Sequence, residues 1–162
     1  MKNYILILTS LFILMSTEKL FSQDKLVRDS ISEIIQNKQF IFKATRALPG
    51  NGRSRQLSFG YDLQVARDSI ISHLPYYGRA YRAPMDPTKG GIQFVSTEFD
   101  YAVEEEKNGW LVTILPKNNS EVDKMFLHVS ESGYASLQVI STFRQPISFN
   151  GRIEERVHLK AF

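Results

Sequence analysis

The chain has 162 residues, the length of one ordinary domain, and it contains no cysteine. The absence of cysteine excludes disulfides, thiolate metal sites, thiol nucleophiles and a lipid anchor attached to a cysteine. Lysine and arginine outnumber aspartate and glutamate by only 20 to 17, a surplus too small to indicate nucleic-acid binding.

The first 23 residues have the pattern of a secretory signal peptide. Lys2 precedes an apolar run, residues 4–15, which is too short to span a bilayer comfortably as a helix. We expect cleavage just before Asp24, with a buried N-terminal helix as the alternative. The sequence therefore predicts a signal peptide over residues 1–23 and a single exported domain, periplasmic or secreted, over residues 24–162. No second long apolar segment follows, so we expect no membrane span after cleavage.

Residues 24–38 are predicted to form one amphipathic helix. Their apolar side chains fall on a single stripe at the helical period, namely Leu26, Val27, Ile31, Ile34 and Ile35. We expect this helix to plug an open barrel end or to cover a sheet edge.

The rest of the chain has short segments of alternating apolar and polar residues bounded by turn signals, which is typical of β-strands. Strands are predicted over residues 57–65, 69–74, 92–103, 110–115, 125–130 and 134–139, with bulges at Gly60 and near Ser96-Thr97 and a solvated turn at residues 104–107. Asn108-Gly109 and Glu131-Ser132-Gly133 indicate two hairpin turns. A further turn at Asn150-Gly151 is predicted to precede a final strand over residues 152 to about 159.

The predicted fold is therefore mainly β, with one N-terminal helix and about eight antiparallel strands. Consecutive hairpins favour a barrel-like sheet, and a two-sheet sandwich is the alternative that periodicity leaves open. Trp110 begins a strand that is apolar on both parities, so we expect it to lie in the core.

The most distinctive stretch of the chain is Leu74-Pro75-Tyr76-Tyr77-Gly78-Arg79-Ala80-Tyr81. It occurs in order with Tyr61-x-Leu63-x-Val65, Asp68-Ser69, Gly91-Ile92-x-Phe94 and Arg144-Gln145-x-Ile147-Ser148-x-x-Gly151. Over residues 40–153 these segments resemble the family called domain of unknown function 4251, exported proteins chiefly of Bacteroidetes-type bacteria. The resemblance implies export and a common fold, and it carries no activity. Many relatives have a lipobox cysteine that this chain lacks, which favours a free protein over an anchored one.

Residues 74–84 set three tyrosines and two arginines between two prolines. In an extended segment Tyr77, Arg79 and Tyr81 project to one side, where a guanidinium between phenols can bind a carboxylate, a phosphate or a sugar ring. The predicted ligand-binding residues are Tyr77, Arg79, Tyr81, Arg82 and Arg144. The alternative is purely structural: the tyrosines cap the barrel end, Arg79 pairs with a carboxylate such as Asp68 or Asp100, and Gly78 and Ala80 are small because another strand passes close.

Recognisable catalytic and metal signatures are absent from the sequence. His73, His128 and His158 have no metal-binding spacing, and neither a Gly-x-Ser-x-Gly elbow nor a phosphate-binding loop occurs. We therefore predict no cofactor and no metal. The favoured function is a non-catalytic module that binds a small anionic or sugar-like ligand. The alternatives are an envelope protein that contacts another protein or has a structural role, and an unrecognised hydrolase.

Overall fold

The structure, a computed structural model, describes residues 24–81, 90–118 and 121–156. The helix spans residues 24–36, and the strands are β1 (Phe40–Pro49), β2 (Arg55–Gln56), β3 (Asp62–Val65), β4 (Ile70–Leu74), β5 (Ile92–Ser96), β6 (Phe99–Glu106), β7 (Gly109–Pro116), β8 (Val122–Ser130), β9 (Tyr134–Ser141) and β10 (Ile147–Glu155). The predicted signal segment, Arg82 and His158 lie outside these ranges. Within them, no helix has the length and apolar character needed to cross a bilayer.

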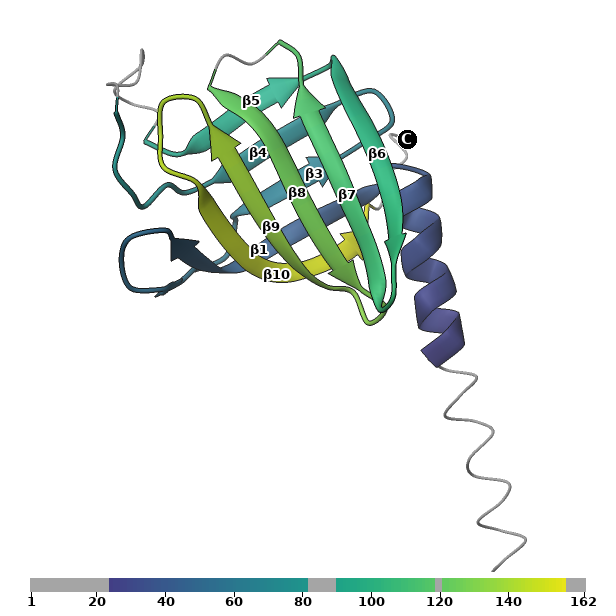
Figure 1. Ribbon diagram of the computed structural model, residues 1–162. Helices are drawn as coiled ribbons and strands as arrows, with labels where there is room; N and C mark the ends of the chain where they lie inside the picture. The colour runs from purple at the N-terminus through teal and green to yellow at the C-terminus, as the bar shows by residue number, and fades with distance from the viewer. Residues whose placement is uncertain (1–23, 82–89, 119–120, 157–162) are drawn as a thin grey trace, which may run out of the picture.

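Nine strands form one antiparallel sheet that curls into a nearly closed barrel (Figure 1). The strand order is β5-β4-β3-β1-β10-β9-β8-β7-β6, and the short β2 pairs only with β1. Two runs of consecutive hairpins, β3 to β5 and β6 to β10, are joined because β1 pairs with both β3 and β10. The predicted mainly β, barrel-like fold is confirmed.

Large apolar side chains fill the interior of the barrel. The largest fully buried ones are Phe40, Phe42, Phe149, Ile35, Leu63, Ile70, Leu74, Ile114, Met125, Leu127, Leu137 and Ile147. Each contributes about 1.5–3 kcal/mol of hydrophobic stabilisation. Trp110 is 3% exposed, which confirms its predicted place in the core. Because these side chains occupy the interior, a ligand would contact the described residues at the barrel ends or on the outer surface.

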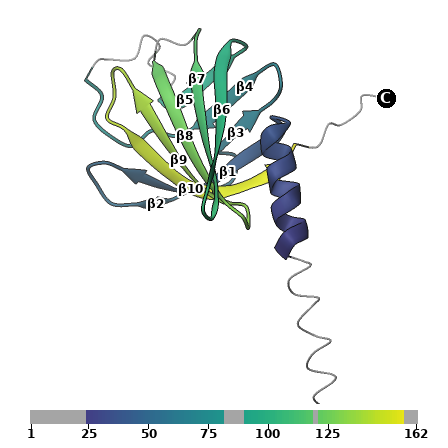
Figure 2. The same ribbon diagram turned by 45° about the vertical axis from the view of Figure 1, so that its right-hand side comes forward.

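The N-terminal helix stands beside β6, one edge of the sheet (Figures 1 and 2). The Tyr101 hydroxyl on β6 donates a hydrogen bond to the carbonyl oxygen of Ile35 at 2.8 Å. Burial raises the pKa of Tyr101, so the phenol stays a neutral donor. Arg28 forms an ion pair with Glu105 of the same strand at 2.7 Å. The helix therefore covers a sheet edge, as predicted.

Only the second half of the predicted apolar stripe is buried. Ile34 and Ile35 belong to the core and Ile31 packs against it, whereas Leu26 and Val27 are 66% and 46% exposed. The views in Figures 1 and 2 agree that the start of the helix extends past the barrel. The apolar stripe is therefore longer than the part of the helix that packs against the sheet.

Two of the predicted strand segments are wrong. The segment 57–65 is not one strand, because β2 ends at Gln56 and β3 begins at Asp62. Gly60 between them has a φ of 98° and lies in a turn, not in a bulge. Likewise, the parity switch near Ser96-Thr97 is no bulge but the bend between β5 and β6, which lie at opposite ends of the strand order. At both places the chain changes direction, so strand pairing stops although apolar residues continue to recur in the sequence.

The predicted turn at Asn150-Gly151 is also wrong, because both residues lie inside β10. A Cβ atom on Gly151 would collide with the carbonyl oxygen of Lys43 on β1. The register of β1 against β10 shifts between Ala44 and Arg46, next to this contact. Here the glycine allows two strands to approach closely at a bulge, which is a different use of the same residue type.

Periodicity missed the ten-residue strand β1 altogether. Its buried residues are Phe40, Phe42 and Ala44 on one parity and Ala47 on the other. The parity changes at the register shift after Ala44. Because a bulge displaces the alternation by one residue, a strict period of two hides such a strand.

Candidate functional site

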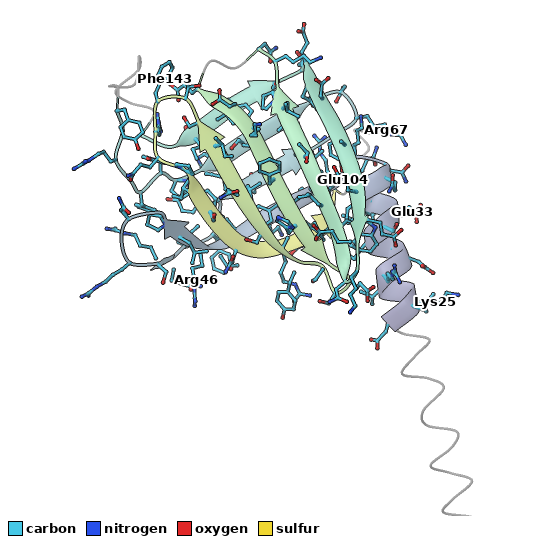
Figure 3. All side chains as sticks on the ribbon, viewed as in Figure 1. Lys25, Glu33, Arg46, Arg67, Glu104 and Phe143 are labelled. Atoms are coloured by element: carbon cyan, nitrogen blue, oxygen red, sulfur yellow. The ribbon has the colours of Figure 1, made fainter. Side chains whose placement is uncertain are left out.

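Residues 75–81 cross one end of the barrel, between the end of β4 and the start of β5 (Phe143 in Figure 3 marks this end). The Tyr81 amide donates to the carbonyl oxygen of Phe143 at 2.8 Å, and the Gln145 amide donates to that of Arg79 at 3.1 Å. Ala80 forms an isolated antiparallel bridge with Arg144. These contacts fix the backbone of residues 79–81 against the connection between β9 and β10. We call the following group the arginine–tyrosine end: Arg55, Tyr76, Tyr77, Arg79, Tyr81 and Arg144.

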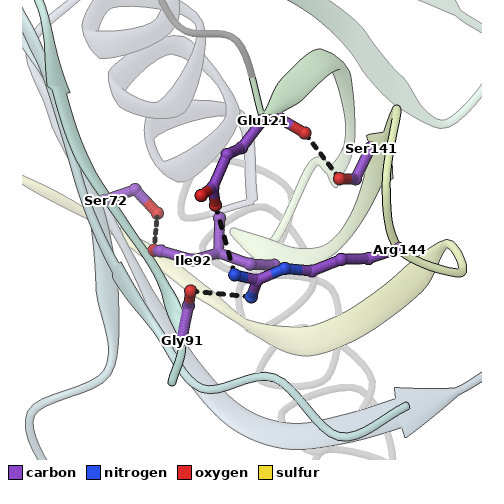
Figure 4. A network of polar contacts seen from close by, with 6 residues as sticks. All are labelled: Ser72, Gly91, Ile92, Glu121, Ser141 and Arg144. Atoms are coloured by element: carbon purple, nitrogen blue, oxygen red, sulfur yellow. Dashed lines mark hydrogen bonds and ion pairs between the residues drawn. The ribbon is translucent and has the colours of Figure 1, made fainter. Parts of the chain in front are cut away.

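Arg144 is buried at this end, and the protein itself holds its guanidinium (Figure 4). Arg144 is 6% exposed. Its Nη1 donates to the carbonyl oxygen of Gly91 at 2.9 Å, and its Nη2 lies 3.2 Å from Oε2 of Glu121. The guanidinium carbon also lies 5.1 Å from the centroid of the Tyr76 ring. Arg144 therefore ties the start of β5 to the residue before β8, and its charge is neutralised within the fold.

Neighbouring hydrogen bonds join the strand ends around Arg144 (Figure 4). Ser72 on β4 donates to the carbonyl oxygen of Ile92 at 2.8 Å, and Ser141 on β9 donates to that of Glu121. Among the described residues, no buried side-chain nitrogen or oxygen lacks a hydrogen-bond partner. The interior side of the arginine–tyrosine end is thus a satisfied structural network.

Tyr76 folds back over its own loop. Its hydroxyl lies 2.9 Å from the carbonyl oxygen of Arg79 and 3.2 Å from that of Gln145, both of which accept from it. Desolvation raises the pKa of Tyr76, against the opposing effects of the Gln145 hydrogen bond and the Arg144 charge. A Cβ atom on Gly78 would lie 2.7 Å from the Tyr76 hydroxyl. Gly78 is therefore small to make room for a residue of the same loop, not for another strand.

Arg79 and Tyr81 are exposed, Tyr81 to 66%. The Arg79 guanidinium makes no hydrogen bond or ion pair with any residue in the described ranges. The two carboxylates considered as its structural partners are engaged elsewhere, since Asp100 pairs with Lys117 at 2.7 Å and Asp68 accepts from Ser69 at 2.9 Å. An exposed cation thus sits on a backbone that is held in place.

Tyr77 is half-buried, and Arg55 of β2 covers its ring with the guanidinium carbon 4.8 Å from the centroid. Sequence reasoning missed Arg55. It stands in a strand of two residues with no alternation to detect, and only the pairing of β2 with β1 brings it to this end of the barrel. Its one local signal is the Gly50-Asn51-Gly52 turn that makes such a hairpin possible.

The structure separates the predicted site residues into three settings. Arg144 contacts Tyr76, Tyr77 contacts Arg55, and Arg79 and Tyr81 are exposed. Arg82 lies outside the described residues. Asp123 accepts a hydrogen bond from Thr142 in the connection between β9 and β10. Of the three arginines at this end, Arg144 is paired with Glu121, which leaves Arg55 and Arg79 as the exposed positive charges. Such an arrangement can attract and hydrogen-bond an anionic group.

The two histidines in the described ranges form their hydrogen bonds with residues outside the arginine–tyrosine end. His73 Nδ1 lies 2.8 Å from the carbonyl oxygen of Gly60, and His128 Nδ1 lies 3.4 Å from Oε2 of Glu106. Within the part of the chain that the structure describes, no three histidine, aspartate or glutamate side chains are grouped so that they could hold a metal ion.

Comparisons with known proteins agree with the resemblance seen in the sequence. The sequence model of the domain of unknown function 4251 (DUF4251) matches residues 22–153. The crystal structure of a DUF4251 family protein from Bacteroides eggerthii DSM 20697 is similar to this chain with a TM-score of 0.61 and 13% sequence identity, and the alignment covers 83% of this chain and 91% of that chain. At this identity the likeness shows the fold alone. No curated protein matches the chain. Because the family match spans most of its length, the chain belongs to the DUF4251 family.

Proposed function

We propose that the protein is a non-catalytic binding module that recognises an anionic group through Arg79, with Tyr81 beside it. The observation that carries this proposal is the exposed guanidinium of Arg79 on a backbone fixed by three hydrogen bonds, two to its carbonyl oxygen and one from its amide. A guanidinium offers forked donors that match a carboxylate or phosphate. A backbone that is already ordered loses less conformational entropy on binding.

The other members of the arginine–tyrosine end have supporting roles in this proposal. Arg55 adds positive charge near the loop, whereas Arg144 is paired with Glu121 and its donors are already used by Gly91 and Glu121. We therefore assign Arg144 a positioning role and keep Tyr77, Arg79 and Tyr81 as the contact residues. The sequence-based assignment of Arg82 as a contact residue stays a prediction.

Replacing Arg79 with glutamine is expected to weaken anion binding about tenfold, because one charge-assisted hydrogen bond contributes roughly 1.5 kcal/mol. Binding can be measured by titrating ¹⁵N-labelled protein with sodium phosphate or sodium glucuronate at constant ionic strength and following amide shifts. Arg67→Gln is the matched control. Arg67 is an exposed arginine in the bend between β3 and β4, and Figure 3 places it on the far side of the barrel from Phe143.

Equal weakening by Arg79→Gln and Arg67→Gln would contradict the proposal, because it would show that only overall charge attracts the anion. A parallel titration with a hexaglutamate peptide separates two sources of the same chemistry. Shifts around Arg79 with phosphate or glucuronate indicate a small anionic ligand. Shifts with the peptide alone indicate an acidic segment of a partner protein.

We also propose that the protein is exported. The support is the charged start and apolar run of residues 1–23 and the export that the family resemblance implies. Fractionation of the producing cells followed by N-terminal sequencing is expected to find the protein in the periplasm or medium, with its first residue at or near Asp24. Recovery in the cytoplasm with Met1 intact would contradict this.

A further inference from the structure

A separate cleft lies on the outside of the barrel, between residues 56–62, β1 and β10. Its volume is about 550 Å³, within the range of roughly 300–1,000 Å³ that is usual for small-molecule sites. The side chains that matter here are Lys43, Phe59, Tyr61, Asp62, Arg152 and Glu154. None of them belongs to the arginine–tyrosine end.

Phe59 lines this cleft with its side chain fully in solvent, at 105% relative exposure. The turn that carries it is fixed on both sides. The Leu57 amide donates to the carbonyl oxygen of Thr45 on β1 at 2.9 Å, and the Ala44 amide of β1 donates to the carbonyl oxygen of Tyr61 at 2.9 Å. On the other side of the turn, Nδ1 of His73 lies 2.8 Å from the carbonyl oxygen of Gly60. A large apolar ring held open to water on a fixed turn adds nothing to the core, but it offers a flat surface to a ligand.

The charges around the cleft balance. Lys43 and Glu154 pair with each other at 2.6 Å, and the guanidinium carbon of Arg152 lies 4.5 Å from the ring centroid of Tyr134. With Asp62, the lining holds two cations and two anions. A charged ligand would gain little from such a site. A ligand rich in hydroxyl groups can use both signs, because each hydroxyl donates and accepts.

We propose that this cleft binds a neutral saccharide. The apolar C–H face of one sugar ring lies against the exposed face of Phe59, where dispersion contacts replace water on both surfaces. The hydroxyl groups at the ring edge donate to Asp62 and accept from Arg152. This site is independent of anion recognition at Arg79, since the two share no residue and differ in net charge.

Saturation-transfer difference NMR on the full mature protein, with cellobiose, maltose and N,N′-diacetylchitobiose as probes, tests the site. We expect at least one disaccharide to receive saturation and to bind in the millimolar range. Phe59→Ala is expected to weaken that binding about three- to tenfold, and Asp62→Asn to weaken it as well. Tyr81→Ala is the matched control, because it removes another strongly exposed aromatic ring, 66% exposed, at the arginine–tyrosine end.

Three results would overturn the saccharide site. One is the absence of saturation transfer to all three disaccharides, and a second is unchanged binding by Phe59→Ala. The third is loss of sugar binding in Tyr81→Ala but not in Phe59→Ala, which would move the sugar to the other end. If no sugar binds and Phe59→Ala abolishes concentration-dependent self-association, Phe59 is a contact between copies instead. The Arg79 titrations use separate probes, so failure of either proposal leaves the other intact.

Discussion

Replacing Arg144 with methionine is expected to lower the free energy of unfolding by about 3 kcal/mol, although most of the stem volume is kept. The variant removes the donor to the Gly91 carbonyl, the ion pair with Glu121 and the cation over the Tyr76 ring. A buried carbonyl oxygen that loses its donor is costly, and Glu121 is itself partly exposed, which keeps the loss below that of a fully buried pair. Urea denaturation followed by tryptophan fluorescence measures it.

Arg79→Met is the control for that experiment. It removes the same charge from the same end of the barrel, but the Arg79 side chain has no partner within the described residues. We expect its stability to stay within about 0.5 kcal/mol of the native protein. If the two variants lost equal stability, the assignment of a structural role to Arg144 and of a solvent-exposed role to Arg79 would be wrong.

Replacing Gly151 with alanine is expected to destabilise the protein by at least about 3 kcal/mol. The new methyl group would collide with the Lys43 carbonyl oxygen and would lie 3.0 Å from a ring carbon of Phe42. The neighbour is backbone in a paired strand, so relief requires β1 and β10 to separate. These two strands join the two hairpin runs of the sheet, so we expect a large shift of the urea midpoint.

Gly90→Ala provides the comparison for Gly151→Ala. A Cβ atom at Gly90 would meet no described heavy atom within 4 Å, and its φ is not in the left-handed region. We expect a change of at most about 0.5 kcal/mol. Similar midpoints for the two alanine variants would show that β1 and β10 are not as closely apposed as the structure has them.

The two arginines show how burial separates residues that a local pattern treats alike. Sequence reasoning placed Arg79 and Arg144 together as ligand contacts, since both are cations near tyrosines or strand ends. In the fold, Arg144 points inward to Gly91 and Glu121, whereas Arg79 is held only through its backbone. An arginine is neutralised only if strand ends that are far apart in the chain bring it a partner. The spacing of residues within a short segment does not predict this.

The sequence by itself determined the features that depend on near neighbours. Its helical stripe, its alternating strands and the hairpins at Asn108-Gly109 and residues 131–133 were predictable, because each reflects which side chains of a short segment face the core. The barrel-like architecture followed from the succession of those hairpins, and the absence of cysteine left stability to the packed core.

Only the tertiary structure decided the features that depend on distant partners. The bulge in β1 hid its alternation, and Gly151 served a close approach to Lys43 where a turn was expected. The pairing of β2 with β1 brought Arg55 over Tyr77, and the loop 57–61 displayed Phe59. The physical reason is the same in each case. Backbone pairing and side-chain exposure depend on the surface that another segment presents, and that surface exists only once the chain has folded.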